Sequence, residues 1–368
     1  MACNIKKVVS YVLGDKSTKD VPNNMTVIGG TVFLEKQSGE GEDAEPILLD
    51  FCDDEDNLQA GLLAVFDGLG GAGAAKVDGE EGVRTGAFYA SRIARTVVEE
   101  TFADAPFGKD KLSDRWHILK SNLESEVGRR AEELDAGSDN LTSSLISQLP
   151  TTVAGMYFEI TSKRTSVDLH TFWAGDSRCY TLRPDKGLQQ LTGDDLKQDG
   201  DAMESLRIDS PMSNYVAADK DFALNVHSSI EDLPVLLISA TDGCFDYLPS
   251  PMHFEQLILN SLSKSGAISE STDMIRASLD DVAGDDASMT LLAIGWQDFD
   301  SLQSDSEKRL KKLESEYTSE IEIIDKKIDR SKSALERLRE KKTEKLNEFW
   351  KSYKQNYEIE KNQKIRIK

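Results

Sequence analysis

The segment GLLAVFDGLGG, residues 61–71, is the stretch on which the fold prediction depends. Its apolar first half is typical of a buried strand, and the run stops at Asp67 and Gly68. A strand that ends on Asp-Gly holds a carboxylate at the edge of a rigid sheet. The glycine lets the backbone turn, so that its carbonyl faces the same point. Because a single Asp-Gly is most often only a turn, a functional interpretation requires that the pattern recur.

Acidic residues do recur, at the ends of other expected strands and in one early loop: Asp176, Asp242, Asp285 and the pair Glu42-Asp43. If brought together, these carboxylates repel one another and resist ionisation, and a divalent cation removes that cost. Mg²⁺ and Mn²⁺ prefer oxygen ligands of this kind. Two such ions lower the pKa of a water molecule and screen an incoming phosphate. The acids therefore predict metal-assisted phosphoester hydrolysis, and the alternative is an acidic, solvated surface.

The composition argues against several other classes of protein. The chain has 368 residues, 39% of them hydrophobic, and its net charge of −22 disfavours binding to nucleic acid or to an anionic membrane. Its four cysteines and four histidines are scattered, which argues against a zinc site and is typical of reduced thiols. No apolar run reaches the ~18 residues of a membrane span, and no signal-peptide pattern is present near Met1. We therefore expect a cytoplasmic protein.

The periodicity of the chain predicts an α+β fold with antiparallel sheets. Strand-like segments come as hairpins and helix-like segments come in two blocks, which does not match a repeating βαβ fold. Residues 192–221 lack a clear period and are expected to form an irregular flap. The expected strands are 26–34, 46–51, a third that ends at 67, 152–160, 167–174, 179–182, 234–241 and 287–296, and the expected helices are 85–102, 112–134, 254–262 and 273–282.

Five short motifs follow the order found in the type 2C, or PPM-type, protein Ser/Thr phosphatases: FDGLGG at 66–71, PTT at 150–152, AGDSR at 174–178, TDGxxD at 241–246 and DDAS at 285–288. The chain resembles that family over about residues 25–297. The resemblance implies a four-layer α-β-β-α sandwich of two antiparallel sheets, with a binuclear Mg²⁺ or Mn²⁺ centre at one end. It also implies hydrolysis of phosphoserine or phosphothreonine in proteins, by an activated water and without a covalent phosphoenzyme.

The resemblance assigns the central metal ligands. Asp67 is similar to the carboxylate that bridges both ions, and Gly68 to the residue that offers its backbone carbonyl. Asp242 and Asp285 resemble the two acids that complete the second ion's site. Asp67 and Asp242 are therefore the residues that we expect catalysis to need most.

The resemblance also assigns four outer acids. Glu42 and Asp43 resemble the family's Glu-Asp pair, although the usual arginine and asparagine around that pair are missing here. Asp176 and Asp246 are similar to acids that hold a third, weaker ion in many members.

The sequence departs from the family pattern at a few places. Ser38 stands where the family carries its phosphate-binding arginine, and Lys36 is the candidate substitute, as a compact charge without a bidentate fork. Leu69 replaces a histidine or methionine, which removes one candidate general acid. Asp286 replaces a common asparagine, and residues 76–81 resemble an insertion. No core ligand is lost, so we expect an active enzyme. Two alternatives stay open: a catalytically silent, phosphatase-like scaffold and a phosphatase of small phosphometabolites.

Residues 300–368 are expected to form a separate helical extension of a catalytic domain that spans residues 1–299. No glycine or proline interrupts this segment, and apolar residues recur in steps of three and four, which predicts a long amphipathic helix or helix pair with a coiled-coil-like seam. The helix is expected to fold back on the catalytic domain or to pair with its own copy. The alternative is a docking arm for a signalling partner, such as a kinase or a substrate. The seam comprises Leu310, Leu313, Tyr317, Ile321, Ile324, Ile328, Leu335, Leu338, Leu346, Phe349, Tyr353 and Tyr357.

Overall fold

The computed structural model describes residues 27–52, 58–103, 112–134, 136, 147–198, 201–205 and 210–357. Contacts divide the chain into two compact units, Met1–Lys312 and Leu313–Lys368. The sequence predicts a loop at residues 137–144 and has basic residues after 360, and both segments lie outside the described residues. No described helix is long and apolar enough to cross a membrane.

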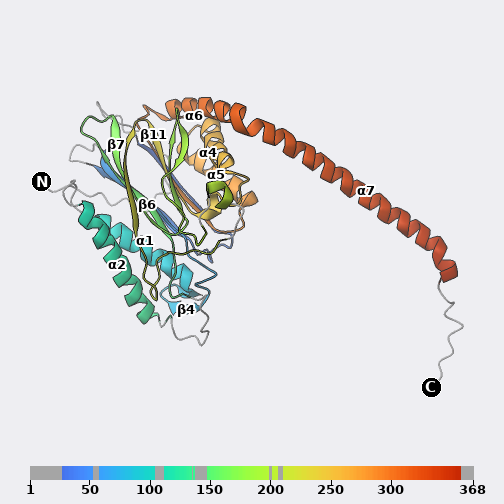
Figure 1. Ribbon diagram of the computed structural model, residues 1–368, viewed down its shortest axis with the longest axis horizontal. Coiled ribbons are helices and arrows are strands. Elements are labelled where there is room, and N and C mark those ends of the chain that lie inside the picture. Colours follow the sequence, from blue (N-terminus) through green and yellow to red (C-terminus); the bar gives the residue numbers. More distant parts are fainter. Residues whose placement is uncertain are drawn as a thin grey trace, which may run out of the picture. The chain divides into compact units, whose positions relative to one another are not determined.

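The first unit is built on two five-stranded antiparallel sheets, as the resemblance implied (Figure 1). One sheet has the order β1-β12-β11-β8-β9, with β1 at Val27–Leu34, β12 at Ala287–Ile294, β11 at Val235–Ala240, β8 at Arg178–Arg183 and β9 at Gly187–Gln190. The other has the order β10-β7-β6-β3-β2, with β10 at Asn225–Asp232, β7 at Ser166–Ala174, β6 at Val153–Ile160, β3 at Leu58–Phe66 and β2 at Ala44–Cys52.

Helices flank both sheets and complete the α+β architecture (Figure 1). Helix α1 (Gly86–Ala103) packs on β2 and β3 and against α2 (Leu112–Glu133). Helices α4 (Pro251–Lys264) and α5 (Ile268–Val282) pack together, and α5 contacts β1 of the other sheet. The segment expected to be an insertion forms a small hairpin of β4 (Lys76–Gly79) and β5 (Gly82–Thr85). The fold-class prediction is therefore confirmed.

Strand β3 is apolar at nearly every position because both of its faces are buried. Leu62 and Phe66 belong to the core that faces α1 and α2, whereas Leu63 and Val65 belong to the core between the sheets. A strand covered on both faces loses the usual alternation of polar and apolar residues. Each of these side chains is fully buried, which stabilises the fold by about 1.5–3 kcal/mol per side chain. Asp67 is thus attached to one of the most firmly packed strands of the molecule.

The flap expected at 192–221 is irregular, as predicted. Its described part contains isolated bridges, Thr151 with Val216 and Leu196 with Met212, and the short helix α3 (Ala202–Ser205). Asp195 fixes the flap because its carboxylate accepts hydrogen bonds from Gly175 N, Asn214 Nδ2 and Asn225 Nδ2 at 2.6–3.1 Å.

Helix α6 (Phe299–Leu313) lies almost entirely within the first unit. Arg309 Nε donates to Glu255 Oε1 of α4 at 2.6 Å in a buried ion pair, and Gln303 Nε2 donates to the Ser265 carbonyl at 2.7 Å. The sequence predicts a catalytic domain of residues 1–299 and a helical extension of residues 300–368, and this division stays a prediction.

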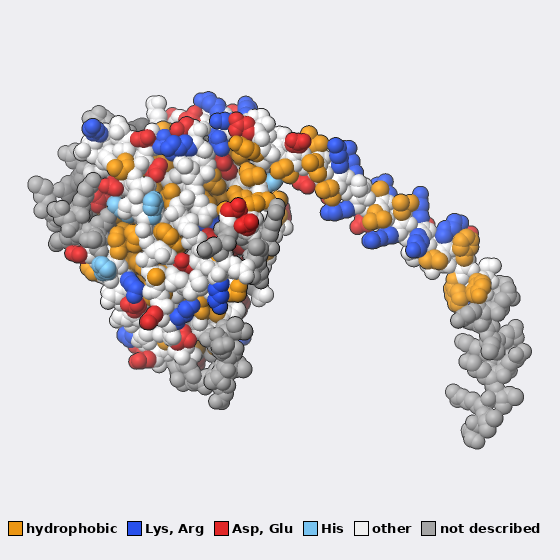
Figure 2. All heavy atoms as spheres, viewed as in Figure 1, with side chains coloured by type: hydrophobic (Ala, Val, Ile, Leu, Met, Phe, Trp, Pro, Cys, Tyr) orange, Lys and Arg blue, Asp and Glu red, His pale blue; other side chains and the backbone are white. Residues whose placement is uncertain are grey.

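The described part of the second unit is a continuous helical segment. A π-helical turn at Glu314–Thr318 leads into α7 (Ser319–Tyr357), a helix of 39 residues. At 1.5 Å per residue α7 is roughly 58 Å long. Figure 2 shows hydrophobic side chains recurring along α7 between Lys and Arg side chains. The predicted long amphipathic helix is therefore present, and its pairing as a coiled coil stays a prediction.

Candidate metal centre

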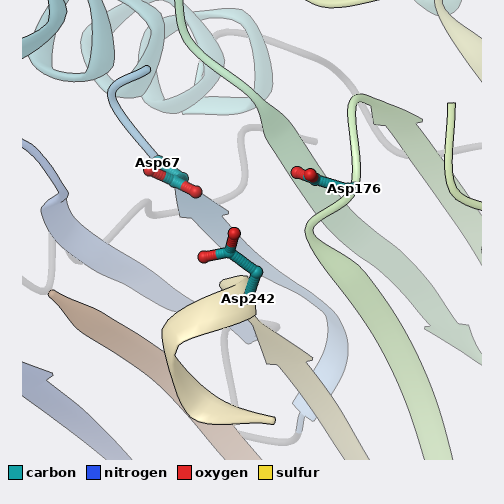
Figure 3. Close-up of side chains that lie close together, drawn as sticks. All are labelled: Asp67, Asp176 and Asp242. Carbon is teal, nitrogen blue, oxygen red and sulfur yellow. The ribbon is translucent and has the colours of Figure 1, made fainter. Parts of the chain in front are cut away.

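Three carboxylates converge where strands end. Asp67 follows β3, Asp176 follows β7 after Gly175, and Asp242 follows β11 at the start of a 3₁₀ turn (Asp242–Cys244). Each offers an oxygen, and these three oxygens lie within 4.8 Å of one another. Figure 3 shows the side chains pointing toward one another from three different segments. The structure thus brings together three of the acids that the sequence predicted as metal ligands.

The electrostatics of this cluster, formed by Asp67, Asp176 and Asp242, favour a bound cation. Burial raises the pKa of Asp67 well above the usual range, and the neighbouring Asp242 and Asp43 carboxylates raise it further. Burial, followed by repulsion from Asp242, raises the pKa of Asp176 in the same way. Burial and Asp285 raise the pKa of Asp242. Carboxylates held this close resist ionising together unless a positive charge lies between them.

One carboxylate oxygen of the cluster is buried without a hydrogen-bond donor among the described residues. Asp176 Oδ1 is buried, and no described group donates a hydrogen bond to it. A buried oxygen without a donor is costly, and a hard cation satisfies it. Because the converging donors are all carboxylate oxygens, the site fits Mg²⁺ or Mn²⁺ and does not resemble a thiolate or imidazole zinc site.

Asp43 lies deep beside the cluster. The residue is 2% exposed, and Thr241 Oγ1 donates a hydrogen bond to Asp43 Oδ2 at 3.0 Å. Burial raises the pKa of Asp43 to about 8, and the charges of Asp286 and Asp242 contribute in the same direction. Thr241 also accepts a hydrogen bond from Ser288 N at 2.9 Å, which ties Asp43 to the ends of β11 and β12.

Glu42 accepts hydrogen bonds from Ser91 of helix α1 and from Thr85, the residue directly before that helix. Thr85 Oγ1 donates to Glu42 Oε1 at 2.6 Å, and Ser91 Oγ donates to the Glu42 carbonyl at 2.6 Å. The carboxylate lies against Gly70, where an added Cβ would stand 1.8 Å from Glu42 Oε2. Burial raises the pKa of Glu42, and Asp285 is among the acids that raise it further. The second glycine of the DGLGG motif therefore makes room for Glu42.

The backbone around Gly68 is tightly packed. A Cβ at Gly68 would lie 2.5 Å from the Glu42 carbonyl oxygen and 2.6 Å from that of Ala87, so no side chain fits. The Asp67 carbonyl accepts hydrogen bonds from Thr151 Oγ1 at 2.7 Å and Thr152 N at 2.8 Å. The PTT motif thus fixes the turn that carries Asp67 and Gly68. The metal-ligand role of the Gly68 carbonyl stays a prediction.

Asp285 and Asp286 have different roles in the structure. Asp285 is exposed, and its charge raises the pKa of Glu42, Asp67 and Asp242. Asp286 accepts hydrogen bonds from Lys36 N at 2.8 Å and Glu42 N at 2.6 Å. It therefore closes the loop that carries the Glu-Asp pair. The sequence had suggested only that Asp286 departs from the family's asparagine.

We expect Asp286→Ala to destabilise the protein by about 1–3 kcal/mol, because two backbone amides lose their charged acceptor. Mn²⁺ affinity is expected to fall as well, since the loop positions Glu42 and Asp43. Asp286→Asn keeps one acceptor oxygen and should therefore lose less stability and less Mn²⁺ affinity than Asp286→Ala. Urea denaturation and calorimetric Mn²⁺ titration measure both effects, with Asp281→Ala, an exposed acid on α5, as the control. Wild-type stability and metal affinity in Asp286→Ala would rule out this role.

Two of the predicted site residues, Lys36 and Asp246, are not among the three converging carboxylates. Lys36 Nζ donates to the Asp280 carbonyl at 2.9 Å near the end of α5, and the predicted phosphate-binding role of Lys36 stays a prediction. Asp246 is exposed, and its backbone amide donates to the Asp242 carbonyl at 2.9 Å. Its charge raises the pKa of Asp176, which places it within electrostatic reach of the cluster.

One cation beside the Glu-Asp pair was missed in the sequence. Arg92 of α1 donates to the Gly41 carbonyl at 3.2 Å and stacks on Phe88, with its guanidinium carbon 3.4 Å from the ring centroid. Burial lowers the pKa of Arg92, and Asp43 and Asp286 are among the acids that act in the opposite direction. Nothing in the local sequence distinguishes this arginine from other helix-surface arginines. Only the packing of α1 against the loop reveals its position.

Comparison with known proteins shows the same architecture elsewhere. The Ser/Thr phosphatase Stp1 from Staphylococcus aureus superposes with a TM-score of 0.52 at 17% identity, over 76% of this chain and 99% of that one. The Mycobacterium tuberculosis Ser/Thr phosphatase PstP/Ppp gives 0.50 at 14% identity, over 73% and 99% of the two chains. This chain has the PPM phosphatase fold. The S. agalactiae Ser/Thr phosphatase agrees, with a TM-score of 0.50 at 15% identity over 73% and 98%.

The likeness is structural and is not visible at the level of overall sequence. No protein-family model and no curated protein matches the sequence. The PPM fold nevertheless agrees with the resemblance that the five short motifs suggested, and the converging acids lie within those motifs.

Proposed function

We propose that this protein is a metal-dependent phosphatase of phosphoserine and phosphothreonine in proteins. The observation that carries the proposal is the convergence of Asp67, Asp176 and Asp242 within 4.8 Å, at strand ends of a fold shared with Ser/Thr phosphatases. The buried Asp176 oxygen without a donor supports a cation at this point.

In this proposal the central ligands would hold two Mg²⁺ or Mn²⁺ ions, and the outer acids would complete their binding and hold a third, weaker ion. Bound divalent cations lower the pKa of a coordinated water and neutralise charge on the phosphoryl group. The central ligands are Asp67, the Gly68 carbonyl, Asp242 and Asp285, and the outer acids are Glu42, Asp43, Asp176 and Asp246.

The chain's own contribution is preorganisation. Thr151 and Thr152 fix the backbone at Asp67, Thr241 fixes Asp43, and Asp286 holds the Glu42 amide. Acids placed by hydrogen bonds on rigid strand ends need no reorganisation during the reaction. In the hydrolysis itself, the water oxygen bonds to phosphorus and the bond from phosphorus to the serine or threonine oxygen breaks. One of the two water protons passes to that leaving oxygen, and the other stays on the phosphate that forms.

A panel of phosphopeptides and small phosphometabolites tests the proposed substrate class. Purified full-length protein with Mn²⁺ is expected to release phosphate from phosphoserine and phosphothreonine peptides. Turnover should be at least about ten-fold faster than on small phosphometabolites, since remote peptide contacts contribute binding energy. Faster turnover of a phosphometabolite than of every peptide would assign a different substrate class to the same site.

A catalytically silent scaffold is the competing function. The observation that favours it is the engagement of Lys36 with Asp280, together with Ser38 at the family's arginine position. A scaffold of this kind binds Mn²⁺ in a calorimetric titration and hydrolyses no member of the panel. Metal-dependent phosphate release would exclude it.

A further inference from the structure

Within the described part of the second unit, no other element covers an apolar seam along helix α7. The seam contains four apolar residues that are 44–63% exposed: Ile324, Ile328, Leu335 and Leu338. With Ser331 counted between Ile328 and Leu335, the steps along the seam alternate between four and three residues. Ile321 starts the same seam and is partly exposed. Spacing of this kind places the residues at the a and d positions of a heptad, the pattern by which helices pair.

The charges beside the seam distinguish the two ways in which α7 could pair with a second copy. In a parallel, in-register pair, position g of one helix faces position e of the next heptad in the other. Glu320 would then face Asp325 of the second copy, and Lys327 would face Lys332. Both contacts join like charges. Lys342 would also stand opposite its own copy within the seam.

An antiparallel pair reverses the sign of these contacts. When Ile324 packs against Leu335 of the second copy, and Ile321 against Leu338, position e faces e and position g faces g. Glu320 then faces Lys341 of the second copy. Two-fold symmetry repeats every contact, as in other isologous interfaces.

The remaining flanking contacts agree with the antiparallel register. Asp325 then faces Lys332 of the second copy, so opposite charges meet, whereas Lys327 faces Ala334 and no like charges meet at that point. We propose that residues 320–341 of α7 pair antiparallel with the same segment of a second copy of this chain. The observations that carry this proposal are the exposed seam and the charge complementarity along its two edges.

Paired substitutions in the full-length protein test the seam. Ile324→Asp places a charge in the seam and is expected to raise the dimer dissociation constant at least about 100-fold. Ile323→Asp is the matched control, because Ile323 is 54% exposed but lies outside the seam, and it should change the constant less than about three-fold. Sedimentation equilibrium measures both constants, and circular dichroism checks that helix content is kept.

A charge reversal tests the orientation. In the antiparallel pair Asp325→Lys creates two Lys–Lys contacts and should weaken the dimer about ten-fold, and adding Lys332→Asp should restore it. In a parallel pair Asp325→Lys would instead meet Glu320 and tighten the dimer. A monomeric wild type, a dimer that Ile324→Asp leaves intact, or a dimer that Asp325→Lys tightens would overturn the proposal. None of these readouts depends on phosphatase activity.

Discussion

Asp67→Ala and Asp242→Ala are each expected to lower the turnover of an aryl phosphate by about a thousand-fold or more. Both carboxylates belong to the cluster, and Asp242 raises the pKa of both Asp67 and Asp176, so these side chains interact electrostatically. In the proposed centre, either substitution takes away one carboxylate ligand. The measurement is initial rate at saturating Mn²⁺, together with Mn²⁺ affinity by calorimetry.

The control for these variants is Glu132→Gln, an exposed acid on α2 far along the chain from the strand ends. It changes the net charge as much as a cluster substitution by a neutral residue does, and should keep wild-type turnover. Near-normal activity in either Asp67→Ala or Asp242→Ala would refute the assignment of the cluster as the catalytic metal centre.

The second large effect concerns stability in the absence of metal. Asp43, Asp67, Asp176 and Asp242 all have pKa values raised above those of ordinary carboxyls, with Asp43 moving from 3.8 to about 8. A raised pKa means that the folded state binds protons more tightly than the unfolded state. The free energy of unfolding therefore falls as the pH rises from about 4 to about 8. Because one pKa unit corresponds to about 1.4 kcal/mol, we expect a loss of several kcal/mol.

Urea denaturation in chelator at pH 5 and pH 8 measures this loss, and repeating the series with Mn²⁺ should largely abolish it. Asp67→Asn provides the matched test, since it removes one charge from the cluster while keeping its shape. In chelator this variant should be more stable than the wild type at pH 8 and should show a weaker pH dependence. A metal-free wild type whose stability rises over this interval would contradict the electrostatic account.

The acids of the centre were predictable because each one follows a local pattern. An apolar run that stops at Asp-Gly marks both a strand and its end, as at Asp67 and Asp242, and sheet geometry then brings strand ends together. Asp176 was predictable from the end of β7, although there the glycine, Gly175, comes before the acid. The roles of the individual ligands stay predictions, since they were carried over from the family and not read from geometry.

Other features could not be predicted because they depend on contacts between distant residues. Asp286 bonds to amides 244 and 250 positions away, and no local pattern announces such a partner. Strand β10 was not predicted because its residues Asn225–Asp232 are largely polar and exposed, as an edge strand permits. Helix α6 was assigned to the extension since its sequence resembles that of α7, whereas the buried pair of Arg309 with Glu255 ties it to the first unit.

The proposed metal-dependent hydrolysis is measured on an aryl phosphate with the purified full-length protein, in chelator, with Mg²⁺ and with Mn²⁺. We expect no turnover in chelator and saturable turnover with at least one of the two ions, which Asp67→Ala should lose and Glu132→Gln should keep. These rates test the proposed function. A folded protein that binds metal but hydrolyses nothing under any of these conditions would contradict it.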